Sequence, residues 1–317
     1  MNKIIFACLT TLLLVITSCS AGEGGSSSDG DYCYGADGVR MQFDTFSERE
    51  ITGNLQIPVE IGLDFENLGP SLADITLDVR GIDSKGDNSI FEVSFIGGDN
   101  KFILQPRECD QEFGDDENVL VSVKVRDGLD LPSKSLRTKA DIALCYQYDT
   151  VYDKPICIKG TESKTGRSGV CDPDNQIFIE SYGQGSPVVV SNIEYTSSIG
   201  RDKAKHTYKI SFEKGRTKWN GNELRIFPPQ SNLCGDKESD FDERKSRNKI
   251  EIKEVKLGLD VLNCNVEEVG IFEIEKQPLT CWIELSNSDS IVRPLYIKAS
   301  YEVEDSITKD SIKFDLS

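Results

Sequence analysis

Cysteine is the residue type whose placement in this sequence most directly predicts chemistry. Residues 16–19 read Ile-Thr-Ser-Cys, and they follow Lys3 and an apolar run that extends from Ile4 to Ile16. An aliphatic residue and two small residues before a cysteine form the pattern of a lipobox, and the apolar run has the length of a signal-peptide core. We therefore expect residues 1–18 to be removed and Cys19 to be lipidated.

Eight further cysteines follow Cys19, and an even number in an exported chain favours disulfides. No two of them have the spacing of a zinc or iron–sulfur site. If residues 143–148 and 154–159 form a hairpin that turns near residue 151, Cys145 faces Cys157 at disulfide distance. The other pairings that we expect are Cys33–Cys109, Cys234–Cys264 and Cys171–Cys281.

Catalytic chemistry finds little support in the residue types. His206 is the single histidine, so it would have to serve any Ser-His-Asp triad, and no Gly-x-Ser-x-Gly motif accompanies it. The neighbouring lysines favour an ordinary surface histidine. The sequence therefore predicts a protein that is not an enzyme and has no catalytic residue.

An acidic segment offers oxygen ligands for a hard cation. Its candidate ligands are Asp110, Asp115, Asp116 and Glu117. Calcium prefers several oxygen ligands at short range, although this spacing does not fit an EF-hand. A solvated loop at a sandwich end is the alternative, because runs of charge usually face water.

Aromatic and basic residues meet in segment 214–222, where Arg216, Lys218 and Trp219 could contact a glycan or a protein partner. The alternative is a hairpin in which Trp219 folds onto its own sheet. Trp282 alternates with Cys281 and Ile283, and we expect it in the core.

The formal net charge of −18 excludes one class of partner. Nucleic acid requires a basic face, and an anionic membrane attracts lysine and arginine, so we expect no nucleic-acid partner and membrane attachment only through the lipid. The simplest interpretation of the negative charge is that it keeps the protein soluble.

The elements that must position these residues are predicted to be strands. Short runs such as 55–65, 75–79 and 120–125 alternate apolar and polar residues, and turn residues separate them. We predict an all-β chain with two tandem immunoglobulin-like β-sandwiches after a signal peptide and a flexible stalk. The expected division is signal peptide 1–18, lipidated cysteine and linker 19–32, first sandwich 33–160, linker 161–186 and second sandwich 187–317.

The two halves resemble each other, since segment 143–148 aligns with 298–303 and segment 61–67 parallels 209–214. Tandem duplication of one fold explains this, and chance similarity between two all-β segments is the alternative.

A family resemblance rests on three short motifs and one turn. Residues 33–43, the segment 145–150 with Cys157, and residues 183–188 resemble secreted two-domain β-sandwich proteins of unknown function from small-genome archaea. The Asn67-Leu68-Gly69 turn is similar to that of adhesion-related immunoglobulin-like (CARDB-type) domains. The resemblance covers roughly residues 33–317 and implies an exported, surface-anchored protein.

These observations together predict a lipid-anchored protein of the cell surface that acts in binding, adhesion or envelope structure, with another surface protein or a glycan as partner. The alternative is a lipoprotein that captures a substrate for a transporter or a surface enzyme, which requires a concave apolar pocket.

Overall fold

A computed structural model describes most of the chain after residue 37. The described residues are 38–44, 51–54, 57–84, 89–97, 99–108, 114–129, 135–161, 171, 184–215, 218–219, 222–229, 247–271, 278–286 and 289–315. The predicted signal peptide, lipidation site and stalk lie outside these ranges. Residues 32–317 belong to one compact unit.

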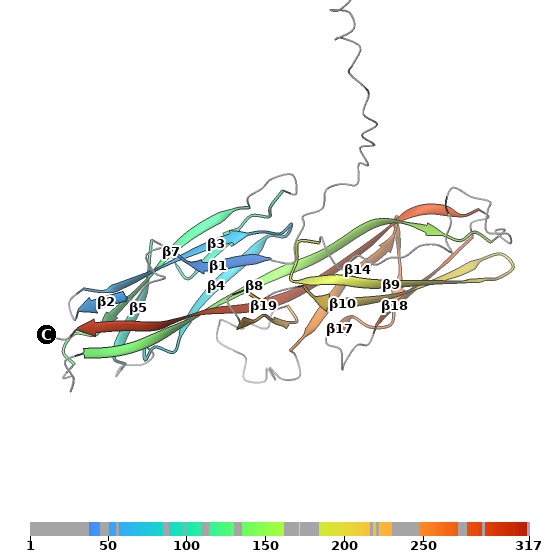
Figure 1. The fold of residues 1–317 in the computed structure, drawn as a ribbon. Helices are drawn as coiled ribbons and strands as arrows, with labels where there is room; N and C mark the ends of the chain where they lie inside the picture. Colours follow the sequence, from blue (N-terminus) through green and yellow to red (C-terminus); the bar gives the residue numbers. More distant parts are fainter. Residues whose placement is uncertain are drawn as a thin grey trace, which may run out of the picture. The chain divides into compact units, whose positions relative to one another are not determined.

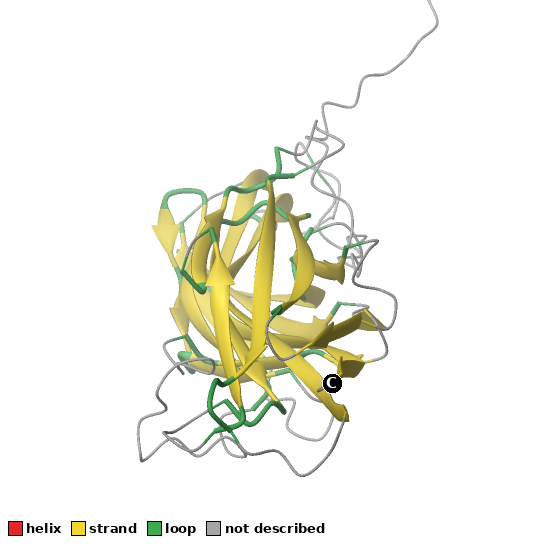
Figure 2. Ribbon diagram, turned by 90° about the vertical axis from the view of Figure 1, so that its left-hand side faces the viewer, coloured by secondary structure: helices red, strands yellow, loops and turns green. Residues whose placement is uncertain are grey.

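The described residues form strands and loops, as Figure 2 shows. The first half contains β1 (Val39–Phe43), β2 (Ile51–Asn54), β3 (Val59–Asn67), β4 (Ala73–Arg80), β5 (Phe91–Ile96), β6 (Lys101–Leu104), β7 (Asp116–Val125) and β8 (Ser135–Ile158). The second half contains β9 (Val188–Ile199), β10 (Ala204–Lys214), β11 (Lys218–Trp219), β12 (Asn222–Glu223), β13 (Arg225–Phe227), β14 (Lys249–Leu257), β15 (Asp260–Val261), β16 (Asn263–Cys264), β17 (Glu268–Gly270), β18 (Leu279–Leu285) and β19 (Ile291–Asp315). The prediction of an all-β chain is confirmed. Within the described ranges, no helix has the length and apolar character needed to cross a membrane.

Three larger sheets organise these strands. One sheet has the order β1-β3-β7-β5, and another has the order β16-β18-β10-β9. The third runs β15-β14-β19-β8-β4-β6, with β13 and β2 also paired to β19 and β17 paired to β14. The first two sheets each provide one layer of a half, and the third sheet extends through both halves.

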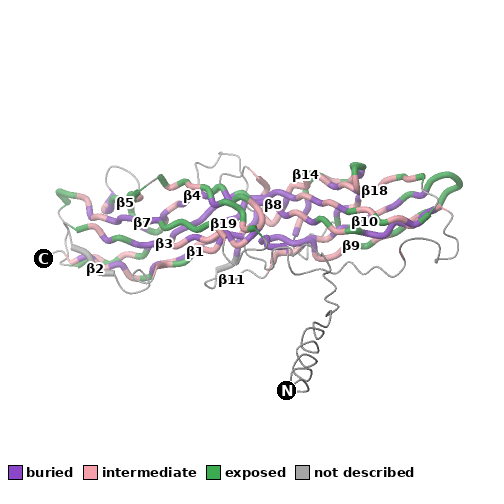
Figure 3. Tube along the Cα trace, turned by 90° about the horizontal axis from the view of Figure 1, so that it is seen from above, coloured by how far each residue is buried: buried purple, intermediate pink, exposed green. Residues whose placement is uncertain are grey.

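The alternating residues explain why these segments become strands. In β4, every second residue from Ala73 to Val79 is buried, while the residues between them carry more solvent exposure. A strand with one apolar face is stable only when that face is covered, so the sheets pack face to face. The buried residues form one core cluster, and in Figure 3 the buried positions run along β8.

The longest pairing in the molecule joins β8 and β19. Figure 1 shows the two strands, green and red, running antiparallel beside one another, and the register extends from Ile291 opposite Ile158 to Asp315 opposite Ser135. The last part of β19 also pairs in parallel with β2. The final strand of the chain therefore lies in the sheet that covers the first half.

The predicted hairpin around residue 151 is wrong, because residues 135–158 form one uninterrupted strand. Segment 298–303, which aligns with 143–148, likewise lies within one strand, β19, from Ile291 to Asp315. The alternating pattern correctly predicts β structure, but a long strand and a hairpin have the same pattern unless a turn residue interrupts it. The division at residues 161–186 stays a prediction, and one sheet contains strands from both sides of it.

The β8–β19 register relates the two halves by an approximate two-fold arrangement. Gln147 and Glu302 occupy the same place in the matching segments 143–148 and 298–303, and they are direct partners. The backbone N–H of Val39 donates to the hydroxyl of Tyr146 over 3.3 Å, and that of Val188 donates to Tyr301 over 3.2 Å. These equivalent contacts support duplication of one sandwich.

Candidate functional site

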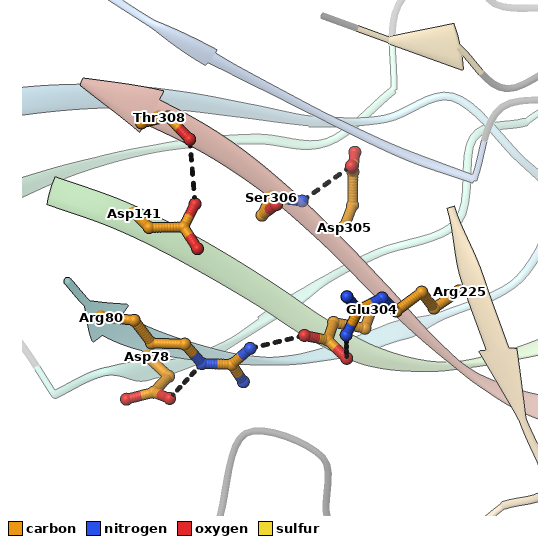
Figure 4. Close-up of polar contacts among 8 residues, drawn as sticks. All are labelled: Asp78, Arg80, Asp141, Arg225, Glu304, Asp305, Ser306 and Thr308. Atoms are coloured by element: carbon orange, nitrogen blue, oxygen red, sulfur yellow. Dashed lines mark hydrogen bonds and ion pairs between the residues drawn. The ribbon is translucent and has the colours of Figure 1, made fainter. Parts of the chain in front are cut away.

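A group of charged side chains lies where β19 passes from the second half into the first. Glu304 is nearly buried, and its Oε1 accepts a hydrogen bond from Nη1 of Arg80 on β4 over 2.5 Å. Its other oxygen, Oε2, lies 3.6 Å from Nη1 of Arg225 on β13. Nε of Arg80 also donates to Asp78 over 2.7 Å, as Figure 4 shows. A carboxylate held by two arginines links strands from both halves.

Asp305 follows Glu304 but points to the opposite side of the strand, as side chains on consecutive strand residues do. Figure 4 shows its carboxyl group directed away from that of Glu304. Oδ1 of Asp305 accepts a hydrogen bond from the backbone N–H of Ser306 over 2.8 Å. Burial raises the pKa of Asp305 to about 6.

This group lines a cavity of about 210 Å³. Its chemistry is that of an ion-pair network, because Glu304 is already engaged by Arg80 and Arg225. Glycosidase chemistry requires two carboxyl groups that flank one substrate bond, and Glu304 and Asp305 diverge instead. The cluster is therefore best suited to fixing β19 in place.

The sequence carries a signal for one buried member of this cluster, Asp305, that was not used in the predictions. Tyr301, Val303, Asp305 and Ile307 occupy alternate positions of one strand, and all four are buried. A carboxyl residue in an otherwise apolar inward-facing series is unusual, because a buried charge is costly. That interruption of the pattern marks the position.

A second pocket, of about 420 Å³, contains part of the predicted calcium site. It is lined by Arg40, Gln42, Asp64, Phe65, Glu66, Gly114, Asp116, Glu117 and Asn118. Asp115 binds the backbone instead, since its Oδ2 accepts a hydrogen bond from the N–H of Gln105 over 2.8 Å. Asp110 lies outside the described residues. Among the residues that the structure describes, no group of three or more His, Cys, Asp or Glu side chains is arranged to hold a metal ion.

The disulfide predicted between Cys145 and Cys157 is wrong. The two residues lie on one strand, about 40 Å apart at 3.3 Å per residue. Cys157 pairs instead with Cys171, with a Cα–Cα distance of 5.8 Å. Cys145 is also disulfide-bonded.

The second described bridge joins Cys264 on β16 to Cys281 on β18. These residues are direct register partners, and their Cα atoms are 4.1 Å apart. The predictions Cys234–Cys264 and Cys171–Cys281 are therefore wrong, because cysteine spacing does not give strand register and leaves many connectivities open. The predicted Cys33–Cys109 bridge lies outside the described residues.

His206 is not a surface residue, contrary to the prediction from its lysine neighbours. It is fully buried, its ring stacks on Tyr195, and its Nδ1 lies 2.8 Å from the Tyr195 hydroxyl. Burial, with a smaller contribution from Arg293, lowers the pKa of His206 to about 4. Lys205, which precedes it in β10, points outward, because strand neighbours alternate between faces.

The predicted partner-binding loop is described only in part. Lys218 and Trp219 form β11, paired with Glu223 and Asn222 of β12, and their side chains are not described. Arg216 lies outside the described residues. Binding by these three residues stays a prediction.

The two halves thus define a disulfide-bonded, all-β protein of sandwich layers. No protein-family model matches the chain. No curated protein matches it either. Nine chains of solved structures match, among them one titled "Salmonella enterica SafA pilin in complex with the SafB chaperone (Type I)". That chain is 12% identical, the match covers 79% of this chain and 84% of that one, and the TM-score is 0.21. A likeness of this size carries no argument about function.

Proposed function

We propose that this chain is a lipoprotein of the cell surface that acts, without catalysis, in binding, adhesion or envelope structure. The observation that carries the proposal is the β8–β19 ladder. Because these strands pair from end to end, the two halves share one hydrogen-bonded sheet. Such a framework holds loops and outer faces in fixed positions for contact with a partner.

The disulfides support an extracytoplasmic location. Cys157–Cys171 and Cys264–Cys281 are formed, and Cys145 is also disulfide-bonded. Disulfides persist in oxidising compartments and are rare in the cytosol. The lipobox-like segment 16–19 supports the same location and adds the anchor.

The pockets favour binding at a surface over capture of a small molecule. Small-molecule sites are lined mostly by apolar side chains, with a few polar groups. The pocket of about 420 Å³ is lined mainly by charged and polar residues, with Phe65 as its large apolar residue. The cavity at the junction is lined by charged residues and Ser306.

The anchor is tested by replacing Cys19. We expect Cys19→Ser to move the full chain from the membrane fraction to the soluble extracytoplasmic fraction, because acyl chains are the proposed attachment. Cys8→Ser is the matched control, since Cys8 lies in the apolar run and outside the lipobox-like segment. Membrane retention of the Cys19→Ser chain, or a native protein that keeps Met1 and carries no acyl group, would contradict the proposal.

The surface role is tested by exposing intact cells to a protease that cannot enter them. We expect the wild-type chain to be degraded, while a cytosolic marker protein survives. Full protection of the chain on intact cells, with degradation after lysis, would show that it does not face outward.

A further inference from the structure

We propose that the outer face of the sheet β16-β18-β10-β9 binds an uncharged polysaccharide, with Trp282 as its stacking surface. This inference rests on the proposed surface function and names a ligand class and a site for it. It corrects the expectation that Trp282 lies in the core.

The register places Trp282 on the outer face. Cys281 precedes Trp282 in β18, and its register partner in β10 is Tyr208. Both residues are fully buried, so they face the core. Trp282 pairs with Thr207 of β10, which alternates with the buried His206 and Tyr208. Trp282 is half-buried, whereas Cys281 beside it is fully buried.

Hydrogen-bonding side chains flank this ring in a straight row. Asn263 of β16, Trp282 of β18, Thr207 of β10 and Thr196 of β9 are successive register partners. Four strands at about 4.8 Å spacing give a row of roughly 14 Å, long enough for an oligosaccharide. A sugar ring offers C–H groups to the aromatic face and hydroxyl groups to threonine and asparagine, which both donate and accept.

The charges on this face balance, which favours an uncharged ligand. Nζ of Lys209 lies 3.8 Å from the Glu194 carboxylate, and Lys205 is the register partner of Glu284. Nζ of Lys205 also lies 5.3 Å from the centre of the Trp282 ring. In a chain with a formal net charge of −18, the two lysines and two glutamates around Trp282 balance, and the lysines supply donors for sugar hydroxyls.

A disulfide holds the row together at its edge. β16 has only two residues, and a strand so short makes few ladder hydrogen bonds. The Cys264–Cys281 bridge fixes it to β18 directly beside Trp282. Asn263 is thereby kept next to the ring, as a preorganised site requires.

The first half provides an internal comparison. Segments 61–67 and 209–214 align, so Leu63 corresponds to Ile210. Their register partners are Val119 and Leu279. Three residues further along each partner strand, Ser122 of the first half corresponds to Trp282 of the second. A sandwich of this kind therefore does not need tryptophan at this position for its core. The second half carries an aromatic ring where the first has a small polar residue.

The test uses the full chain in mild detergent, titrated calorimetrically with cellohexaose, N-acetylchitohexaose, maltohexaose and mannohexaose. We expect the wild type to bind at least one of them and Trp282→Ala to weaken that binding about tenfold or more, because the stacking surface is lost. Trp282→Phe should weaken it less, since it keeps an aromatic ring.

Tyr296→Ala is the matched control and should leave the affinity unchanged. Tyr296 is also a half-buried aromatic residue with a lysine over its ring, since Nζ of Lys256 lies 6.0 Å from the ring centre. It belongs to β19, in a different sheet, so its loss removes an aromatic surface without touching the proposed row.

Folding is checked by thermal melts of every variant. If Trp282→Ala does not fold, Thr207→Val and Trp282→Phe take its place, and both should weaken binding. The proposal is overturned if the wild type binds none of the four sugars, if the Trp282 and Thr207 variants bind as the wild type does, or if Tyr296→Ala weakens binding as much as Trp282→Ala. Capture of an envelope protein without sugar binding also overturns it, whereas the Cys19→Ser fractionation stands independently.

Discussion

Asp305 on β19 and His206 on β10 are buried titratable side chains, and burial moves their pKa values in opposite directions. The pKa of Asp305 is raised to about 6, and that of His206 is lowered to about 4. Both shifts favour the neutral form in the folded state. As pH falls from about 6.5 towards 4, His206 therefore loses its contribution to folding stability. As pH rises from about 4 through 6, Asp305 loses its contribution.

Asp305→Asn tests the second effect. Because the folded pKa of Asp305 lies above its unfolded value, its contribution to stability is fully present below about pH 4 and is lost as pH rises through 6. Asparagine keeps the carbonyl oxygen that Ser306 contacts but cannot ionise. We expect the variant to exceed the wild type in unfolding free energy by about 1–3 kcal/mol at pH 8 and to match it at pH 4, measured by urea denaturation. A difference that is equal at both pH values would show that Asp305 does not titrate in this range.

Asn67 and Gly69 form the turn that the family resemblance includes. The side-chain nitrogen of Asn67 donates to the backbone oxygens of Ser71 and Gln105, over 2.8 and 2.9 Å, and its Oδ1 accepts from the backbone N–H of Gly69 over 3.2 Å. A Cβ atom on Gly69 would collide with the hydroxyl of Tyr148. Glycine is required here because the backbone passes too close to that ring for any side chain.

At the scale of elements, β19 is the strand on which both halves depend. Its first part pairs with β14, and its last part lies between β8 and β2. Ile312 and Phe314, near the end of the chain, are fully buried, and Phe314 packs on Phe91 of β5 with ring centres 5.4 Å apart. Ile312 and Phe314 thus complete the core of the first half.

Phe314→Ala tests this dependence. Removing a buried ring loses its transfer free energy and leaves a cavity, so we expect destabilisation of about 3–5 kcal/mol. Hydrogen exchange should show lost protection in β5 and in residues 135–146 of β8. Asp310→Ala, at an exposed position of the same strand, should change stability by less than about 0.5 kcal/mol. Loss of protection confined to residues 188–300 would contradict the assignment of this strand to the first half.

At the scale of the whole molecule, cross-links and the shared sheet hold together a chain that carries strong mutual repulsion. The formal net charge of −18 favours solubility but opposes compaction. The Cys157–Cys171 and Cys264–Cys281 bridges join residues 14 and 17 positions apart in the sequence, and they restrict the unfolded chain. Stability should therefore depend on the redox state of the surroundings.

Reduction of the full chain tests this. Each bridge contributes about 2–4 kcal/mol, so we expect a clear fall in the melting temperature with excess dithiothreitol. A variant with both Cys264→Ser and Cys281→Ser should show a lower melting temperature before reduction and a smaller fall on reduction. An unchanged melting temperature of the wild type after complete reduction, verified by thiol titration, would mean that the bridges do not stabilise the fold.

The sequence predicts the class of structure from its period. Apolar residues occupy every second position in segments such as 75–79 and 120–125. This pattern requires strands with one covered face, and those strands are present. The period does not, however, fix which face is covered when both faces carry apolar residues. In β18, Leu279, Cys281, Trp282 and Ile283 give no clear phase, and a shift of one residue exchanges the two faces. The expectation that Trp282 lies in the core is wrong for this reason. The expectation that His206 lies at the surface is wrong because it rested on the adjacent lysines and not on the regular alternation of buried residues in β10.

Local sequence thus determined the β character and the expected export, because each depends on residues close together in the chain, and composition determined the acidic charge. Tertiary structure alone decided that β8 and β19 pair, that Cys157 meets Cys171 and that Trp282 faces outward. These outcomes depend on strand register between segments far apart in the sequence or on loops that bring cysteines together. Register is set by the packing of the complete core, which no single segment contains.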